Sequence, residues 1–180
     1  MSASENDIGL WEKFRNGDEE SFVLIFRNYY SELYNYGCKI CGNPNIIEDS
    51  IQELFMDLFR SKGKAEIISL KAYIFKSFKF KLIKLLNKNL KSAGFVTETE
   101  QFEVSHEMFL ILNEDNNELS EKLNGAIQDL SSRQKEIIYL RFHLNLSYEE
   151  ISEIMQISYQ AARNLVYQSI KSLKSRMVVC

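Results

Sequence analysis

Apolar residues in the first half of the chain recur every three or four positions, which is the spacing of amphipathic helices. This spacing predicts a helix over residues 18–42 and a long helix over about 70–90. Between them, Asn45 and Glu48 form a capping-box pattern that predicts another helix start. The core stripe of this middle helix is expected to be Ile47, Ile51, Leu54, Phe55, Leu58 and Phe59.

The second half of the chain shows the same spacing in shorter segments. An amphipathic helix is predicted from Leu119 to Leu130, and Ser131 with Gln134 forms a capping-box pattern before the next one. The apolar positions of that next helix are Ile137, Ile138, Leu140 and Phe142.

A helix-turn-helix pattern follows. Ser147 and Glu150 begin a short helix with a further capping-box pattern, and residues 156–158 form a tight turn whose Ser158 caps a last helix from Tyr159 to about Met177. The short helix has its apolar face at Ile151, Ile154 and Met155. In the last helix the positions expected to face inward are Ala162, Leu165, Val166, Ser169, Ile170 and Leu173.

The opposite stripe of this last helix is polar and chemically distinctive. It contains Gln160, Arg163, Asn164, Tyr167, Lys171 and Lys174. Gln, Arg and Asn side chains make paired hydrogen bonds with base edges in the major groove, and the later lysines are placed to reach phosphates. The alternative is an ordinary helical hairpin with a solvated face.

Composition favours an all-α protein. The 180 residues include only 7 Gly and 1 Pro, so few residues break helices or form the tight turns of a many-stranded sheet. The chain has no apolar run long enough to span a membrane and no secretory signal at its N-terminus, so we expect it in the cytoplasm.

The net charge of the chain is only -3, but basic and acidic residues are grouped in separate blocks along it. Residues 60–91 hold ten basic side chains and one acid, whereas 92–122 hold eight acids and one lysine. The acidic stretch has weak periodicity, which is typical of a linker. We therefore predict two helical domains, 1–91 and 120–180, joined by an acidic linker over 92–119.

The basic block overlaps the long helix over 70–90. Tyr73, Lys76, Phe80 and Lys84 are spaced so that rings and ammonium groups share one helical face, a combination that suits single-stranded nucleic acid. The alternative is that the aromatic residues, including Phe75 and Phe78, are core and the lysines a solvated face. In the preceding helix the polar side is expected to expose Asp49, Gln52, Glu53 and Asp57.

Cysteine and histidine provide little support for other chemistry. Cys38 and Cys41 form a CxxC motif. The only further cysteine or histidine ligands are His106, His143 and distant Cys180. We therefore interpret the two cysteines as small apolar helix residues and not as a redox or zinc site. The chain has no Gly-rich phosphate loop, HExxH or GxSxG motif. We expect no enzyme activity, no cofactor and no small-molecule substrate.

These motifs resemble the extracytoplasmic-function (ECF) class of bacterial sigma factors, over nearly the whole chain. DEESFVLIFRNYYSELYNYG with IIEDSIQELFMDLFR is similar to the region 2 helices, and residues 129–177 are similar to region 4. The resemblance implies a promoter-specificity subunit that binds core RNA polymerase and promoter DNA, both as duplex and as opened strand. A stand-alone helix-turn-helix regulator is the alternative, but it assigns no role to the acidic surface or to the basic aromatic helix.

The resemblance also assigns residues. It implies polymerase docking by Asp49, Gln52 and Glu53. Recognition of the minus-35 element falls to Tyr159, Gln160, Arg163, Asn164, Tyr167, Lys171 and Lys174. Recognition of the minus-10 element falls to Tyr73, Lys76, Lys79, Phe80 and Lys84, and Lys79-Phe80 stands where the family commonly has Arg-Asn. Phe80 is expected either to stack on a base or to point inward. The pattern QAARNLVYQSIKSLK is most similar to the iron-dicitrate-uptake type of Bacteroidetes, which implies a membrane-bound anti-sigma factor.

Overall fold

The computed structural model describes residues 3–62, 67, 69–92, 102–103 and 117–178. It divides into two compact units, residues 1–99 and 100–180. All the regular secondary structure within the described ranges is helical, which confirms the all-α prediction.

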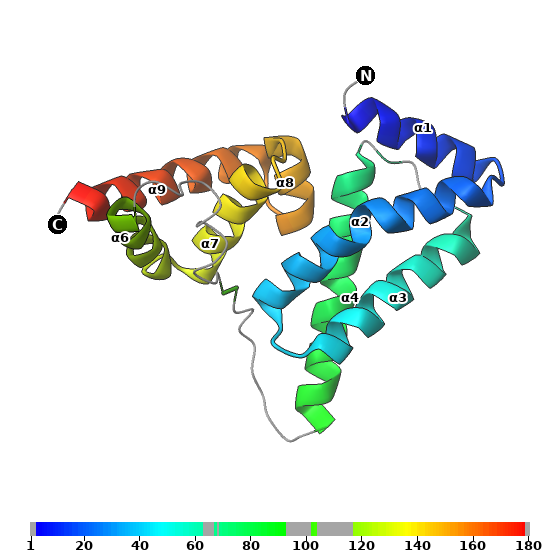
Figure 1. The fold of residues 1–180 in the computed structure, drawn as a ribbon, viewed down its shortest axis with the longest axis horizontal. Coiled ribbons are helices and arrows are strands. Elements are labelled where there is room, and N and C mark those ends of the chain that lie inside the picture. Colours follow the sequence, from blue (N-terminus) through cyan, green and yellow to red (C-terminus); the bar gives the residue numbers. More distant parts are fainter. Residues whose placement is uncertain (1–2, 63–66, 68, 93–101, 104–116, 179–180) are drawn as a thin grey trace. The chain divides into compact units, whose positions relative to one another are not determined.

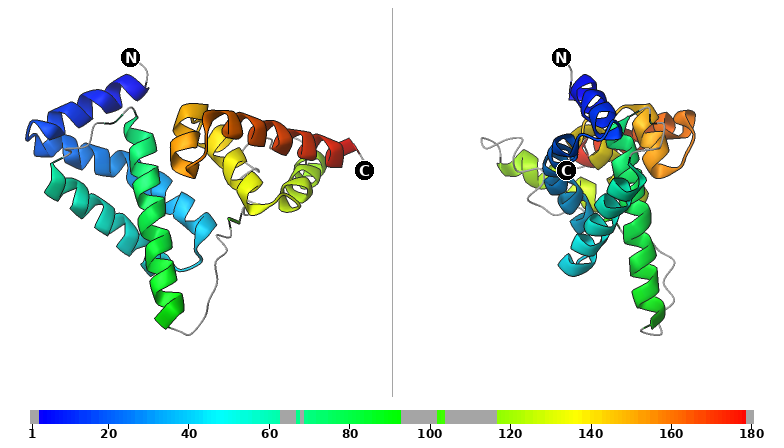
Figure 2. Two further views of the ribbon diagram at one scale, coloured as in Figure 1. Left: turned by 180° about the vertical axis from the view of Figure 1, so that it is seen from behind. Right: turned by 90° about the vertical axis from the view of Figure 1, so that its right-hand side faces the viewer.

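Unit 1 is a bundle of α1 (Ala3–Arg15), α2 (Glu19–Ile40), α3 (Pro44–Ser61) and α4 (Leu70–Ser92). Helices α2 and α3 lie side by side, and α4 crosses both of them on one side (Figures 1 and 2). Helix α1 contacts α2 and α4. Helices α2 and α4 therefore each pack against all three other helices of unit 1.

Local chemistry explains where these helices begin. Asp18 caps α2 by accepting a hydrogen bond from the amide of Glu20, at 3.2 Å. Helix α3 begins earlier than predicted, because the cap is Asn43 rather than Asn45: its Oδ1 accepts from the Asn45 amide at 3.0 Å. Pro44 then fits the first turn, where its missing N–H has no helical partner to lose.

The core of unit 1 is aromatic and closely packed. Tyr36 of α2 lies edge-on to Phe75 of α4, with ring centroids 5.4 Å apart, and both side chains are fully buried. A Cβ atom at Gly37 would lie 2.8 Å from the Ile47 side chain, so the glycine allows α2 and α3 to approach closely. The predicted core stripe of α3 is confirmed except at Phe59, which is 45% exposed because it lies at the edge of the α2–α3 contact.

Unit 2 contains α6 (Asn117–Gln128), α7 (Ser132–Ile138), the π-helix η1 (Tyr139–His143), α8 (Tyr148–Met155) and α9 (Tyr159–Val178). Both predicted capping boxes are present, Ser131 with Gln134 and Ser147 with Glu150. Gln156 adopts a left-handed conformation that ends α8, and the Ser158 hydroxyl accepts from the Ala161 amide at 3.1 Å. The helix-turn-helix is confirmed. Phe142, one of the apolar positions of the predicted helix, lies in the π-helix and is exposed.

The predicted linker is largely outside the described residues, but its edges can be placed. Helix α4 extends to Ser92 and α6 begins at Asn117, so both helices enter the predicted 92–119 linker. Phe102 is buried against the Tyr139 ring, 5.7 Å away, and Glu103 pairs with Lys135 at 3.4 Å. This short piece of the acidic stretch therefore belongs to the packing of unit 2.

Candidate functional site

Helix α9 presents the polar stripe expected from the sequence. Ala162, Val166 and Ser169 are buried against the rest of unit 2, which turns the opposite side of the helix outward. All seven residues assigned to this surface are exposed: Tyr159, Gln160, Arg163, Asn164, Tyr167, Lys171 and Lys174. The packing therefore leaves a continuous row of hydrogen-bonding groups on one face.

Contacts within the stripe order its first turns. The Gln160 amide nitrogen donates to Asn164 Oδ1 at 3.2 Å, and the Arg163 guanidinium lies 5.9 Å from the Tyr159 ring centroid. Both contacts are between exposed groups and are weak enough to exchange for base edges. The N-terminal part of α9 thus holds amide and guanidinium groups in a row suited to a major groove.

Helix α4 presents a smaller surface than the sequence predicted. Lys76, Phe80 and Lys84 are exposed on one face. Tyr73 is half-buried, with its ring 5.7 Å from Trp11, and Lys79 is half-buried as well. The structure therefore brings three of the five predicted minus-10 residues onto an open face and places the other two beside it. Phe75 and Phe78 are core, as the alternative interpretation held, whereas Phe80 points outward.

The acidic side of α3 is exposed as predicted, but one member is already paired. Asp49, Gln52 and Glu53 are exposed, whereas Asp57 accepts a hydrogen bond from the Lys81 ammonium of α4 at 2.5 Å. This hydrogen bond and the charge of Lys81 lower the pKa of Asp57 below its ordinary value. The first three residues are thus left as the acidic surface, while Asp57 fixes α4 to α3.

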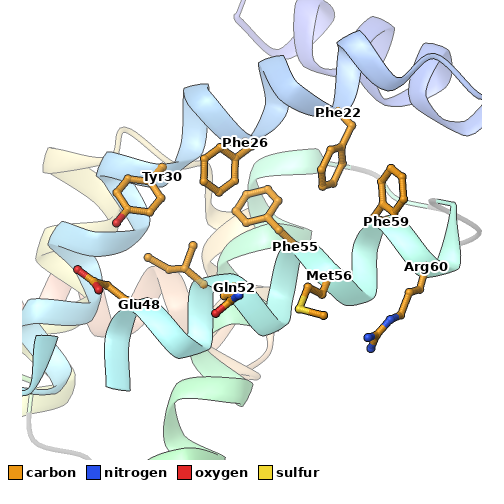
Figure 3. Close-up of a pocket in the computed structure, with 10 residues that line it drawn as sticks. Phe22, Phe26, Tyr30, Glu48, Gln52, Phe55, Met56, Phe59 and Arg60 are labelled. Atoms are coloured by element: carbon orange, nitrogen blue, oxygen red, sulfur yellow. The ribbon is translucent and has the colours of Figure 1, made fainter. Parts of the chain in front are cut away.

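A groove between α2 and α3 lies beside this surface, and sequence reasoning missed it. It encloses about 590 Å³. Figure 3 shows rings from α2 facing rings from α3 across it, with Glu48 near one end and Arg60 near the other. Its lining consists of Phe22, Phe26, Tyr30, Glu48, Ile51, Gln52, Phe55, Met56, Phe59 and Arg60. The i, i+4 spacing of Phe22, Phe26 and Tyr30 was the available signal in the sequence.

The CxxC segment shows no geometry of a metal centre. Cys41 is buried at the end of α2, where its Sγ accepts from the Asn43 amide at 3.3 Å, whereas Cys38 is exposed. No group of three or more potential metal ligands occurs within the described residues, and His106 and Cys180 lie outside them. No helix within the described ranges is long and apolar enough to cross a membrane.

Comparison with known proteins agrees with this geometry. Residues 120–173 match the family model for sigma-70 region 4. The chain is 21% identical to an ECF RNA polymerase sigma factor, SigM of Bacillus subtilis, over 84% of this chain and 91% of that one. It is 23% identical to the ECF RNA polymerase sigma-E factor of Haemophilus influenzae, over 98% of both chains.

Two solved structures share the fold. CnrH, solved in complex with the cytosolic domain of CnrY, has a TM-score of 0.63 at 13% identity, covering 96% of this chain and 97% of that one. The sigma factor RpoE of Bartonella quintana, solved with the anti-sigma factor NepR, has a TM-score of 0.55 at 19% identity, covering 89% and 96%.

Residues 120–173 thus match sigma-70 region 4, and the chain is similar over most of its length to sigma factors of the ECF class. The protein is an RNA polymerase sigma factor that acts in transcription initiation.

Proposed function

We propose that the protein is a dissociable specificity subunit of core RNA polymerase that divides promoter recognition between its two units. The observation that supports this most strongly is the exposed polar stripe of α9, the second helix of a well-formed helix-turn-helix. The chain supplies specificity and helps to open the duplex, and the polymerase supplies the chemistry. We propose no catalytic site in this chain.

Unit 2 would bind the minus-35 element as duplex. In a helix-turn-helix the second helix enters the major groove with its N-terminal residues at the bases. Gln160, Arg163 and Asn164 occupy that part of α9, while Lys171 and Lys174 lie further along, where a helix leaves the groove and meets phosphates. Base recognition therefore falls to the first group and charge neutralisation to the second.

Unit 1 would hold the opened strand at the minus-10 element. The exposed face of α4 combines one ring with two ammonium groups, Phe80 with Lys76 and Lys84. Rings stack on unpaired bases, and cations neutralise phosphates, so this surface favours a single strand over a duplex. The interaction should weaken steeply with salt concentration.

Polymerase docking would use α3. Asp49, Gln52 and Glu53 offer exposed carboxylate and amide groups, and Gln52 also lines the apolar groove. We propose that the two features form one docking surface, in which the groove supplies apolar burial and the acids select a basic partner segment.

Further partners and the cellular location are inferred from the resemblance. The Bartonella quintana relative was solved with an anti-sigma factor, which supports an inhibitor of that kind here. We propose a membrane-bound anti-sigma factor, a relationship to the iron-dicitrate-uptake type of Bacteroidetes, and a cytoplasmic site of action.

Co-elution with bacterial core RNA polymerase tests this function, followed by transcription from fragments of genomic DNA. The expected result is a stable complex that produces transcripts from a small set of promoters. Duplex binding without polymerase association would contradict the proposal and favour a stand-alone helix-turn-helix regulator.

The docking surface can be tested separately by the double substitution Asp49→Lys with Glu53→Lys. The change should abolish co-elution with core polymerase, because it reverses the charge of the exposed surface without touching the core. A matched control is the reversal of Glu19 and Glu20, two exposed acids at the start of α2. Retained co-elution of the α3 variant, with its helical circular dichroism unchanged, would remove these residues from the docking site.

A further inference from the structure

The junction between α2 and α3 carries two cysteines to which the proposed function assigns no role. The sequence favoured two small helix residues, but the structure places only Cys38 within α2, where its thiol is exposed. Cys41 is the C-cap of α2, with an extended backbone conformation, and its side chain is buried. One accessible thiol and one sheltered thiol therefore lie where the chain leaves the helix.

The backbone brings these two cysteines within the range of a disulfide. The residues between them, Lys39 and Ile40, are helical, so the two Cα atoms are roughly 5 Å apart. Disulfides join Cα atoms that are about 4.4–6.8 Å apart. The Cys41 amide also donates to the Gly37 carbonyl at 2.8 Å, which holds Cys41 against the last turn of α2. The Cα spacing therefore permits a bond between the two sulfur atoms.

The side chains need a further small movement before this bond can form. In a helix, Cβ atoms three residues apart are separated by about 5–6 Å, whereas a disulfide needs about 3.5–4.5 Å. Cys41 has room to move, because it has left the helical conformation and is followed by Gly42, where an added Cβ would meet no atom of the described residues within 4 Å. A disulfide closed in this way is strained, and strained disulfides are readily reduced. The bond is thus expected to be reversible.

The sulfur of Cys41 is also coupled to the start of α3. Its Sγ accepts a hydrogen bond from the Asn43 amide at 3.3 Å. Asn43 is the N-cap of α3, and its Oδ1 accepts from the Asn45 amide at 3.0 Å. Moving Sγ toward Cys38 removes the contact that orients Asn43, so the first turn of α3 loses support. Asp49 of the proposed docking surface lies in the next turn.

We propose that Cys38 and Cys41 are a modification site, at which hydrogen peroxide produces a reversible intramolecular disulfide that weakens docking on core polymerase. The disulfide follows from the geometry of the junction alone. Its effect on docking rests on the proposed function, because it acts through α3. The proposal adds a redox response to a helix that is otherwise assigned only to docking.

The chemistry takes place in two steps. The accessible Cys38 thiolate attacks one peroxide oxygen, the O–O bond breaks, and the products are a sulfenic acid and hydroxide. The Cys41 thiolate then attacks the Cys38 sulfur, which forms the S–S bond and displaces a second hydroxide. The two thiol protons convert both hydroxides to water. The thiols lose two electrons in total, and the peroxide gains them.

Peptide mapping tests the disulfide in the full-length protein. The protein is treated with hydrogen peroxide, its remaining thiols are alkylated, and it is digested with trypsin. Cleavage after Lys39 separates residues 28–39 from 40–60, so only a disulfide keeps Cys38 and Cys41 together. The linked pair should be two hydrogen atoms lighter than the sum of the peptides, and dithiothreitol should release both. Irreversible oxidation of Cys38, or a link only to Cys180, would overturn the proposal.

The effect on docking is measured as affinity for core polymerase, before and after peroxide. Loss of an N-cap costs about 0.5–2 kcal/mol, so oxidation should weaken binding by about 2- to 30-fold, and dithiothreitol should restore it. The matched control is Cys38→Ser, an exposed change that removes the disulfide and should make binding insensitive to peroxide. This variant also accounts for Met56, an exposed thioether in the groove whose oxidation dithiothreitol does not reverse.

The outcomes separate the two proposals. If the reduced protein does not bind polymerase, the proposed function fails, while the peptide map still decides whether the disulfide forms. If the disulfide forms but oxidised and reduced protein bind polymerase equally, the coupling to α3 is overturned. An equal loss of binding in peroxide-treated Cys38→Ser would overturn the coupling as well, because the loss would then arise at another residue.

Discussion

Helices α4 and α9 are both proposed to bind DNA, but they differ in how much of their surface is exposed. Helix α4 lies against α1, α2 and α3, so most of its apolar residues are core and one of its cations is tied to Asp57. Helix α9 leaves a whole stripe free, from Tyr159 to Lys174. Helix α9 also packs against three helices, α6, α7 and α8, so the difference lies in the side chains and not in the number of neighbours. Helix α4 buries Leu70, Ala72, Ile74, Phe75, Phe78 and Leu82, whereas α9 buries Ala162, Val166 and Ser169 and leaves a broader face to a ligand.

The chemistry of the two faces follows from this difference. The narrow face of α4 presents one ring and two ammonium groups, which suits a flexible single strand. The broad face of α9 presents amide and guanidinium groups in register, which suits the fixed edges of a duplex. The two helices are thus expected to respond to mutation in distinct ways.

The largest difference should appear in stability. Phe78→Ala, at a fully buried ring of α4, should lower the free energy of unfolding by about 3–5 kcal/mol. Tyr167→Ala, at a ring of α9 that is 68% exposed, should change it by less than about 0.5 kcal/mol. Urea denaturation followed by circular dichroism measures both. Equal losses would show that the two helices are packed alike.

The next effect concerns specificity on α9. Arg163→Ala should weaken binding to the preferred minus-35 sequence by about 1–3 kcal/mol and relax the preference at one position. Lys171→Ala should weaken binding to all sequences alike, because a phosphate contact does not depend on the base. Affinities of the polymerase complex for a set of single-base promoter variants distinguish these results. A uniform loss for Arg163→Ala would mark it as a phosphate contact.

A smaller effect concerns salt on α4. Lys76→Gln should reduce the salt dependence of opened-strand affinity by about one unit of slope, because one phosphate contact is lost. Lys81→Gln should leave the slope nearly unchanged, since Lys81 is half-buried and paired with Asp57. Affinity of the polymerase complex at several salt concentrations provides the slopes. Equal changes would show that the ion pair opens on binding.

The smallest effect is a pH dependence of unit 1. Because the pKa of Asp57 is lowered by Lys81, the stabilisation is fully present above the ordinary value of 3.8 and is lost as the pH falls below it. The size should be less than about 1 kcal/mol, because the Asp57 side chain is 59% exposed. Asp57→Asn should remove this part of the acid sensitivity in urea titrations at several pH values. An unchanged pH profile would mean that the pair does not contribute.

Features set by neighbouring residues were predictable from the sequence. The capping box of Ser147 with Glu150 and the outward stripe of α9 depend on spacing within one or two turns, and both are present. The cap of α3 was placed two residues late because Asn43 and Asn45 have the same chemistry, and only the position of Pro44 favours the first.

Features made by two elements were not predictable in this way. The outward direction of Phe80 depends on which face of α4 meets α3. The groove depends on how the side chains of α2 and α3 are placed against one another. The pair of Asp57 with Lys81 joins residues 24 positions apart, and buried Phe102 packs beside the ring of Tyr139, which lies in a different element. Spacing along one segment contains no information about any of these contacts.

The most direct test of the division between the two helices is site-specific crosslinking in the polymerase complex. A photoreactive phenylalanine analogue is placed at Phe80 or at Tyr167, and the crosslinked DNA is mapped in closed and open complexes. The analogue at position 167 should label the minus-35 duplex in both complexes, whereas the analogue at position 80 should label the non-template strand only after opening. Labelling of closed duplex from position 80 in the same pattern before and after opening would contradict the account.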